Sequence, residues 1–198
     1  MRKKTPILCL ILFTVCLTAC TRYDNKRLEP VGQIPEIESF KSIEEFENAE
    51  RKKTSRKAET YYVPVLPEDQ YTLTSVTKRE NVYVSVAYHV DLPEDLAGQL
   101  RTDYDRERCQ SLICQTYLFE DGTVTLQGFL NNGYKETEVN GRTYYRWDEH
   151  AENSPGRPVI GYEIVFPAEG RLIFMHLPGV GSFEEMMRYA DPVKRVIE

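Results

Sequence analysis

Alternating hydrophobic and polar positions dominate the middle and the end of the chain and predict β-strands. In Asn81–Val90 every second residue from Val82 onwards is valine or tyrosine, and Val159–Phe166 repeats the same period. Successive side chains of a strand point to opposite faces, so this period predicts strands that bury one face against a core. Shorter apolar runs predict further strands at Tyr61–Pro67, Tyr71–Thr77 and Arg171–Leu177.

Turn motifs predict that neighbouring strands pair in antiparallel fashion. The motifs are Asp121-Gly122, between Tyr117–Glu120 and Thr123–Leu126, and Asn140-Gly141, between Lys135–Val139 and Arg142–Trp147. Asn-Gly and Asp-Gly readily adopt the left-handed conformations that two-residue hairpin turns require. Ala168-Glu169-Gly170 predicts a third tight turn, just before the strand that begins at Arg171.

Amphipathic segments predict helices over Ser42–Arg56, Pro93–Glu107 and Ser182–Ala190. The first and the last begin with serine followed three residues later by glutamate, which is the capping-box pattern, and Pro192 ends the last one. Hairpin-linked strands with amphipathic helices predict an α+β domain. We expect a single antiparallel, curved sheet of about eight strands with helices packed on one face.

The N-terminus has the pattern of an export signal. Three basic residues precede the apolar run Ile7–Leu17, and Leu17-Thr18-Ala19-Cys20 matches a lipobox. In proteins that this pattern resembles, the cysteine is diacylated and becomes the new N-terminus. The predicted organisation is a lipoprotein signal peptide over 1–19, a lipidated N-terminus with a flexible tether over 20–41, and one extracytoplasmic domain over 42–198.

Charge narrows the partners of the exported part. The signal holds three of the 25 basic residues and none of the 31 acidic ones, so 22 basic residues remain against 31 acidic ones, a net charge of −9. Nucleic acid is therefore excluded as a partner, because binding phosphates needs a cationic surface. An acidic domain is not attracted to anionic lipids, so membrane attachment depends on the two acyl chains expected on Cys20. The basic run Arg51–Lys57 is interpreted as a solvated helix end rather than a membrane contact.

Cys109 and Cys114 are the cysteines that remain after the signal and the acylation candidate are set aside. An even pair in an exported domain is typical of a disulfide, and two reduced, buried cysteines are the alternative. The spacing of five residues suits a turn or a helix–strand junction. A two-cysteine metal site lacks companion ligands at usable spacing.

Motifs for catalysis and for cofactors are missing from the sequence, so no catalytic residue, metal or cofactor is predicted. Asp148, Glu149 and His150 offer three ligands, but adjacent residues rarely converge on one ion. His89 and His176 fall in predicted strands, where we expect satisfied or surface imidazoles. Aromatic residues on a polar hairpin, Tyr144, Tyr145 and Trp147, form a candidate binding face for a glycan or a protein. The alternative is cross-strand packing of Trp147 on Tyr134.

The segment Tyr62–Tyr71, with the pattern (Y/F)-V-P-x-x-L-P-x-x-Y and a following strand, resembles the extracytoplasmic domain of unknown function found in Gram-positive anti-sigma-factor-like proteins and lipoproteins. Asp69-Gln70 replaces the glycine that is usual before this tyrosine. The resemblance implies an envelope sensor or interaction domain and brings no catalytic residues. We therefore expect a non-enzymatic, membrane-anchored protein that binds or senses a protein or envelope component. A carrier with an apolar pocket and a hydrolase with an unrecognised site are the alternatives.

Overall fold

The computed structural model describes residues 36–53, 58–67, 69–118 and 125–198. The elements in chain order are β1 (Ile37–Phe40), α2 (Ile43–Lys52), β2 (Glu59–Val63), β3 (Tyr71–Arg79), β4 (Tyr83–Val90), α3 (Glu94–Ala97), α4 (Asp103–Gln110), β5 (Ser111–Tyr117), α5 (Leu126–Asn131), β6 (Lys135–Val139), β7 (Arg142–His150), the 3-10 helix η1 (Ala151–Asn153), β8 (Val159–Ala168), β9 (Arg171–Pro178), α6 (Phe183–Met186), the 3-10 helix η2 (Met187–Tyr189) and β10 (Val193–Ile197).

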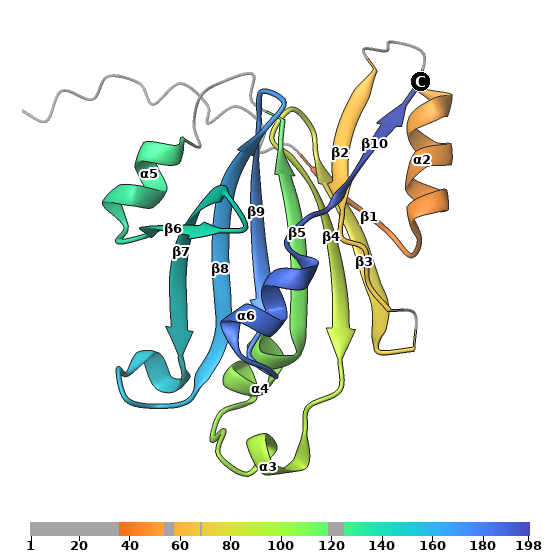
Figure 1. Ribbon diagram of the computed structural model, residues 1–198. Coiled ribbons are helices and arrows are strands. Elements are labelled where there is room, and N and C mark those ends of the chain that lie inside the picture. Colours follow the sequence, from red (N-terminus) through yellow and green to blue (C-terminus); the bar gives the residue numbers. More distant parts are fainter. Residues whose placement is uncertain (1–35, 54–57, 68, 119–124) are drawn as a thin grey trace, which may run out of the picture. The chain divides into compact units, whose positions relative to one another are not determined.

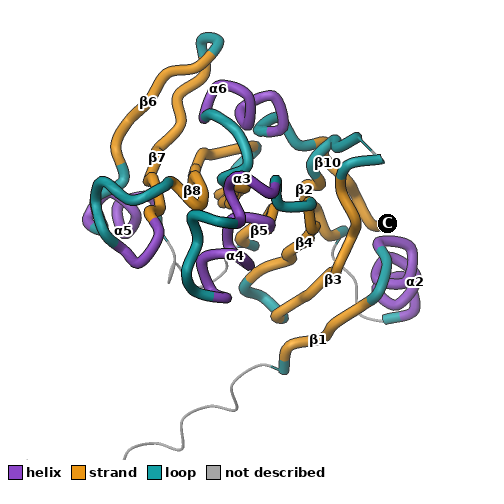
Figure 2. Tube along the Cα trace, turned by 90° about the horizontal axis from the view of Figure 1, so that it is seen from below, coloured by secondary structure: helices purple, strands orange, loops and turns teal. Residues whose placement is uncertain are grey.

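Within these residues, eight strands form one open antiparallel sheet in the order β1-β3-β4-β5-β9-β8-β7-β6 (Figure 1). The other two, β2 and β10, pair with each other in a separate ribbon. Figure 2 shows the sheet curving around this ribbon and α6. The predicted α+β class, with one antiparallel sheet of about eight strands, is confirmed.

The inner face of the sheet carries the main core. Val84, Val86, Cys114, Ile164 and Met175 lie on this face, and none of them is exposed. Side chains from the ribbon, α2, α6 and η2 fill the curve of the sheet, chief among them Phe46, Tyr61, Tyr62, Phe183, Met186 and Tyr189. The buried positions follow the period-two pattern of the sequence, because one side of each strand meets this layer.

Helix α2 is held to the sheet by apolar packing and by buried charge. Phe46 packs edge-on against Tyr61 with ring centroids 5.3 Å apart. Lys78 of β3 is only 6% exposed, and its Nζ lies 2.7 Å from Glu50 Oε2 and 2.5 Å from Glu59 Oε2. A buried ammonium is tolerated only when it is paired in this way. These two ion pairs of Lys78 join α2, β2 and β3.

The helices, which we expected on one face, divide between the two. On the outer face Phe129 of α5 stacks on Phe174 of β9, with ring centroids 6.2 Å apart and planes 22° from parallel. Arg108 of α4 reaches Glu163 of β8 from the same side. The outer face is therefore partly covered, because the strands place these large and charged groups opposite the inner core.

Two of the three predicted turns are confirmed. Asn140-Gly141 joins β6 to β7 with φ angles of 53° and 75°, and Glu169-Gly170 joins β8 to β9 with 46° and 75°. The third, Asp121-Gly122, lies outside the described residues. Its expected second strand, Thr123–Leu126, is wrong because Thr125 Oγ1 accepts a hydrogen bond from Gly128 N and caps α5.

Other element boundaries also differ from the expectation. The helix over Pro93–Glu107 is two helices, since Thr102 caps a new helix and Leu100 between them is buried. Ile37–Phe40, assigned to the tether, forms β1 and pairs with β3. The strand at Tyr61 ends before Pro64 and lies in the ribbon. Its partner β10 was not predicted. Helix α2 ends at Lys52 rather than near Arg56.

Replacing Lys78 with alanine should lower the free energy of unfolding by about 3 kcal/mol, because Glu59 would keep a partly buried charge without its cation and Glu50 would keep only Lys53. Burial already raises the pKa of Glu59. The loss should therefore be larger at pH 7.5 than at pH 5, where the stranded carboxyl groups take up protons more easily. Urea unfolding of the wild type and Lys78→Ala at both pH values measures this.

Lys52→Ala is the matched control, because Lys52 is exposed on α2. It should change the free energy of unfolding by less than about 0.5 kcal/mol. Equal stability of Lys78→Ala and Lys52→Ala would show that the ion pairs of Lys78 do not hold α2 in place.

Candidate functional site

A groove of about 630 Å³ lies at the edge of the sheet formed by β6 and β7. We call it the edge groove. Its walls come from β6 and the residues before it, from the second half of β7, and from the loop after η1. The lining residues are Gly133, Lys135, Glu136, Thr137, Arg146, Trp147, Asp148, Glu149, His150, Asn153 and Pro155.

The groove exists because β6 is shorter than β7. The strands pair only from Val139 opposite Arg142 to Lys135 opposite Arg146, whereas β7 continues to His150. Gly133 has a φ of +93°, which favours glycine. The N–H of Gly133 donates to Leu130 O within the α5 turn, so the chain before β6 turns toward α5.

Trp147 is the principal aromatic group of the groove. Its side chain is 44% exposed, and its ring lies 6.3 Å from that of Tyr134, centroid to centroid. A Cβ atom on Gly133 would lie 3.1 Å from Cζ3 of the indole, so the glycine lies against the ring. The predicted packing of Trp147 on Tyr134 is confirmed, and it leaves much of the indole open to a ligand.

The predicted binding face of three aromatic residues is wrong in one member. Tyr144 is 5% exposed and packs edge-on against Phe166 in the inner core, with ring centroids 5.2 Å apart. Tyr145 and Trp147 lie on the outer face, since residues two apart share a face. Tyr145 is half-buried and does not line the groove. Trp147 is thus the one residue of the predicted face that the groove exposes.

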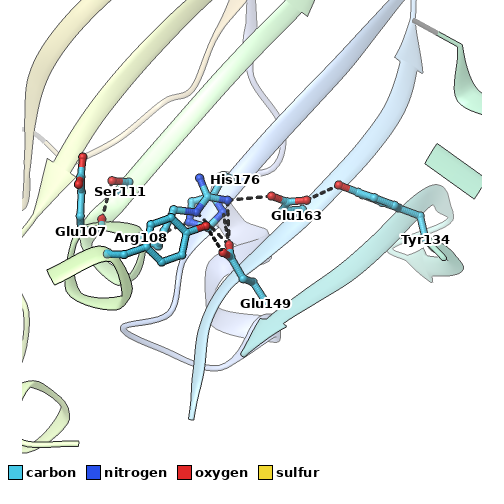
Figure 3. Close-up of polar contacts among 8 residues, drawn as sticks. Glu107, Arg108, Ser111, Tyr134, Glu149, Glu163 and His176 are labelled. Atoms are coloured by element: carbon cyan, nitrogen blue, oxygen red, sulfur yellow. Dashed lines mark hydrogen bonds and ion pairs between the residues drawn. The ribbon is translucent and has the colours of Figure 1, made fainter. Parts of the chain in front are cut away.

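Next to Trp147, the outer face carries a partly buried ion-pair cluster (Figure 3). Nη2 of Arg108 lies 2.8 Å from Glu149 Oε2 and 2.8 Å from Glu163 Oε1, while Arg108 Nε donates to Glu149 Oε2 at 2.9 Å. Burial disfavours the charge on Arg108, but the hydrogen bond to Glu149 and the charges of Glu149 and Glu163 together outweigh it, and the pKa of Arg108 is raised. Glu149 belongs both to this cluster and to the wall of the edge groove.

Two tyrosines complete the hydrogen bonds of these carboxylates. Tyr104 Oη donates to Glu149 Oε1 at 2.9 Å, and Tyr134 Oη donates to Glu163 Oε2. Burial raises the pKa of both phenols, and the hydrogen bonds to the carboxylates raise them further. Each of the four carboxylate oxygens therefore accepts a hydrogen bond from a side chain of the protein.

His176 lies at the bottom of this cluster and is fully buried. Its Nε2 lies 2.9 Å from the carbonyl oxygen of Arg108 and must carry the proton, because a carbonyl only accepts. Its Nδ1 has no hydrogen-bond partner among the described residues and lies 3.8 Å from Glu149 Oε2. Burial and the nearby charge of Arg108 lower the pKa of His176 to about 4. The imidazole fits only because Gly161 lacks a side chain: a Cβ atom there would lie 2.0 Å from His176 Cε1.

Glu149, Glu163 and His176 place ligand atoms within 4.8 Å of one another, close enough to suggest a metal ion. The guanidinium of Arg108 already contacts both carboxylates and supplies the positive charge that an ion would bring. The three adjacent residues Asp148, Glu149 and His150 do not converge on one point. Asp148 pairs with Arg146, and His150 Nδ1 donates to Arg157 O at 3.1 Å. We therefore interpret the cluster as a structural ion-pair network.

Cys109 and Cys114 are both free and buried. Cys109 packs with Leu100 in a small cluster beside α4, whereas Cys114 lies in the inner core. The disulfide alternative is therefore wrong, since the change from helix to strand at Ser111 sends the two side chains into different layers. Burial raises the pKa of the Cys109 thiol to about 11, and it also raises that of Cys114.

Arg108, Glu163 and His176 were not singled out from the sequence as a site. Glu163 is the one acidic residue of β8 and His176 the one histidine of β9, and a polar residue inside an apolar strand was the available signal. The interpretation of His176 as a satisfied strand imidazole holds for Nε2, which is bound to Arg108 O, but not for Nδ1, which has no hydrogen-bond partner among the described residues. His89, also in a strand, is half-buried, and its Nε2 lies 3.3 Å from Gln110 Nε2.

No protein-family profile, curated protein or solved structure matches this chain. Cys20 and the signal segment 1–19 lie outside the described residues, so lipidation remains a prediction. Among the described residues, no helix is long and apolar enough to cross a membrane.

His176 should make stability depend on pH between 6.5 and 4. In this window the unfolded chain binds a proton on His176 and the folded chain does not, so the free energy of unfolding falls as the pH falls. With a folded pKa of about 4 against the ordinary histidine value of 6.5, the loss from pH 7 to pH 5 should be about 2 kcal/mol. Urea unfolding at the two pH values measures it.

His176→Gln is the comparison, since a glutamine amide can still donate to Arg108 O. Its stability should change less between pH 7 and pH 5 than that of the wild type, whatever its absolute stability. If His176→Gln lost as much unfolding free energy between pH 7 and pH 5 as the wild type, the pH dependence would belong to other groups. The lowered pKa values of Glu47 and Glu50 act mainly below pH 4.5, outside this comparison.

Proposed function

We propose that this chain is a non-enzymatic, lipid-anchored extracytoplasmic protein that binds a protein or envelope component in the edge groove. The observation that carries the proposal is Trp147, a large aromatic residue 44% exposed in a groove of about 630 Å³. Exposed aromatic groups in a concave site are typical of binding hot spots, because they bury much apolar area at a low entropy cost. The polar groups around the indole can orient a ligand.

The arrangement of the carboxylates supports binding over catalysis. Glu149 and Glu163 are the acidic pair nearest the groove, and a hydrolase would need one of them as a base or nucleophile. Arg108 contacts both, and the two tyrosines take the other oxygens. Each oxygen of the pair is thus held by a donor of the protein itself, which supports a structural role for the pair.

The filled core counts against the carrier alternative. A carrier needs an apolar cavity between the inner face and its covering layer. Val84 and Val86 are instead fully buried in one hydrophobic cluster with Phe46, Tyr61 and Ile197. The edge groove has a more polar wall, which suits a ligand with hydrogen-bonding groups.

Anchoring rests on the sequence. Cys20 at the end of a lipobox, an acidic domain and the resemblance of Tyr62–Tyr71 to extracytoplasmic domains support a position at the outer side of the cell membrane. An envelope sensor or interaction domain is what that resemblance implies. A tethered domain meets envelope ligands at high local concentration, which lets a modest groove act as a useful binding site.

Cys20→Ser should abolish labelling by a radioactive or clickable fatty acid and release the protein from membranes. Thr18→Ser, which keeps the cysteine, is the matched control and should label normally. Fractionation with alkaline washing measures attachment. Membrane retention of Cys20→Ser equal to that of the wild type would identify an uncleaved anchor and end the lipoprotein proposal.

Trp147→Ala should weaken binding to envelope fragments from the source cells by about tenfold or more, the size expected for a hot-spot residue. Binding is measured by titrating full-length protein in detergent against purified fragments. Val65→Ala removes another exposed apolar side chain, 62% exposed, that does not line the groove, and should bind as the wild type does. Equal affinities of Trp147→Ala and Val65→Ala would contradict the proposed site.

A further inference from the structure

The edge groove is lined by five consecutive residues of β7, from Arg146 to His150. Consecutive residues of a strand point alternately to the two faces of the sheet. A hollow over one face would be lined by every second residue only. The edge groove therefore exposes the side of the strand itself, where its main-chain groups lie.

The hairpin register shows which main-chain groups face the groove. Val139 and Arg142 close the two-residue turn, and in such a hairpin the closing residues form a hydrogen-bonded pair. Hydrogen-bonded pairs recur at every second position, so the N–H and C=O of Arg146 and Asp148 point toward the β6 side. Pairing with β6 ends at Lys135, opposite Arg146. Asp148 is thus the first residue whose main chain meets the groove in place of β6.

The chain before β6 makes no main-chain hydrogen bond to Asp148. The N–H of Gly133 donates to Leu130 O, and that of Tyr134 donates to Phe129 O. Both groups are used within the turn that follows α5. On its other side β7 is paired with β8 in continuous register from Tyr145 to Glu149, with Trp147 opposite Glu163 and Asp148 opposite Tyr162, and the register shifts only between Glu149 and His150.

We infer that the edge groove binds an extended peptide segment of a partner protein, which continues the line of β6 along the open edge of β7. This rests on the proposed function and names the ligand of the same groove. The open edge from Trp147 to His150 is four residues long, or about 13 Å at 3.3 Å per residue. Strand addition of this kind takes its affinity from main-chain hydrogen bonds and its selectivity from alternate side chains.

The two faces of the groove set the side chains of the peptide. On the outer face, the exposed indole of Trp147 favours an apolar or aromatic residue opposite it. On the inner face, the ion pair of Arg146 with Asp148 favours a polar residue at the next position. A glycan, by contrast, would stack on the indole and would have no need of the Asp148 main chain.

Selection of random dodecapeptides displayed on phage, with full-length protein in detergent as the bait, supplies the probe. The enriched peptide is then synthesised and its Kd measured by fluorescence anisotropy. Asp148→Pro removes the N–H that faces the groove and leaves the hydrogen bonds of β7 to β8, which Trp147 and Glu149 make. Asp148→Ala is the matched control, because it removes the carboxylate and keeps the N–H.

Asp148→Pro should weaken peptide binding about tenfold or more, as expected for a lost main-chain hydrogen bond and a disturbed edge, while Asp148→Ala stays within about threefold. N-methylation of the peptide, one amide at a time, gives a second test that uses the wild-type protein alone. Affinity should fall at alternate positions only, because every second amide faces β7. This test decides the matter if Asp148→Pro does not fold.

Failure to enrich any peptide, equal binding by Asp148→Pro and Asp148→Ala, or an N-methyl series without a two-residue period would each overturn the inference. Two further outcomes would overturn it if no peptide binds. The first is binding of envelope glycan fragments that Trp147→Ala abolishes. The second is a concentration-dependent dimer, seen in sedimentation, that Trp147→Ala abolishes. In those two cases the proposed function of the groove stands and only the peptide is wrong. If Trp147→Ala binds envelope fragments as the wild type does, the proposed function fails as well.

Discussion

The contact of Arg108 with two carboxylates is the constraint on which the outer side of the domain depends. The guanidinium joins α4 to β7 through Glu149 and to β8 through Glu163, and two tyrosines saturate the remaining oxygens. A partly buried group of this kind is costly to break, because removing one partner leaves the other charges unpaired and only partly solvated. It therefore holds α4 and the second half of β7 in one relative position. The missing side chain of Gly161 leaves room for the imidazole of His176, which donates a hydrogen bond to the carbonyl oxygen of Arg108.

The edge groove follows from this arrangement and from one glycine. Gly133, at a φ of +93°, takes the chain away from β7 before β6 can extend further. The second half of β7 cannot follow, since its Glu149 is held by Arg108. A strand that is fixed on one side and unpaired on the other exposes main-chain groups, which proteins otherwise protect. The short length of the open edge and the charged side chains of Arg146 and Asp148 limit unwanted pairing.

Much of the sheet could be predicted because its signals are local. The valine period of β4, the alternation in β8 and the Asn140-Gly141 turn each depend on neighbouring residues, and the structure contains all three. Predictions were wrong where a distant partner decided the outcome. Ile37–Phe40 has no sustained pattern and is a strand only because β3 offers an edge. Likewise, β10 was not expected, and it forms against β2, about 130 residues earlier in the chain.

The candidate site shows the same division. The sequence by itself determined that Trp147 stands on a polar hairpin near Tyr134, and that His176 belongs to a strand. Only the tertiary structure decided that Tyr144 faces the core, that Cys109 and Cys114 part into different layers, and that Arg108, Glu149 and Glu163 meet. Glu149 and Glu163 follow Arg108 by 41 and 55 positions along the chain. Period and turn chemistry act over a few residues, whereas the meeting of buried charges is set by strand order and register, which no local pattern encodes.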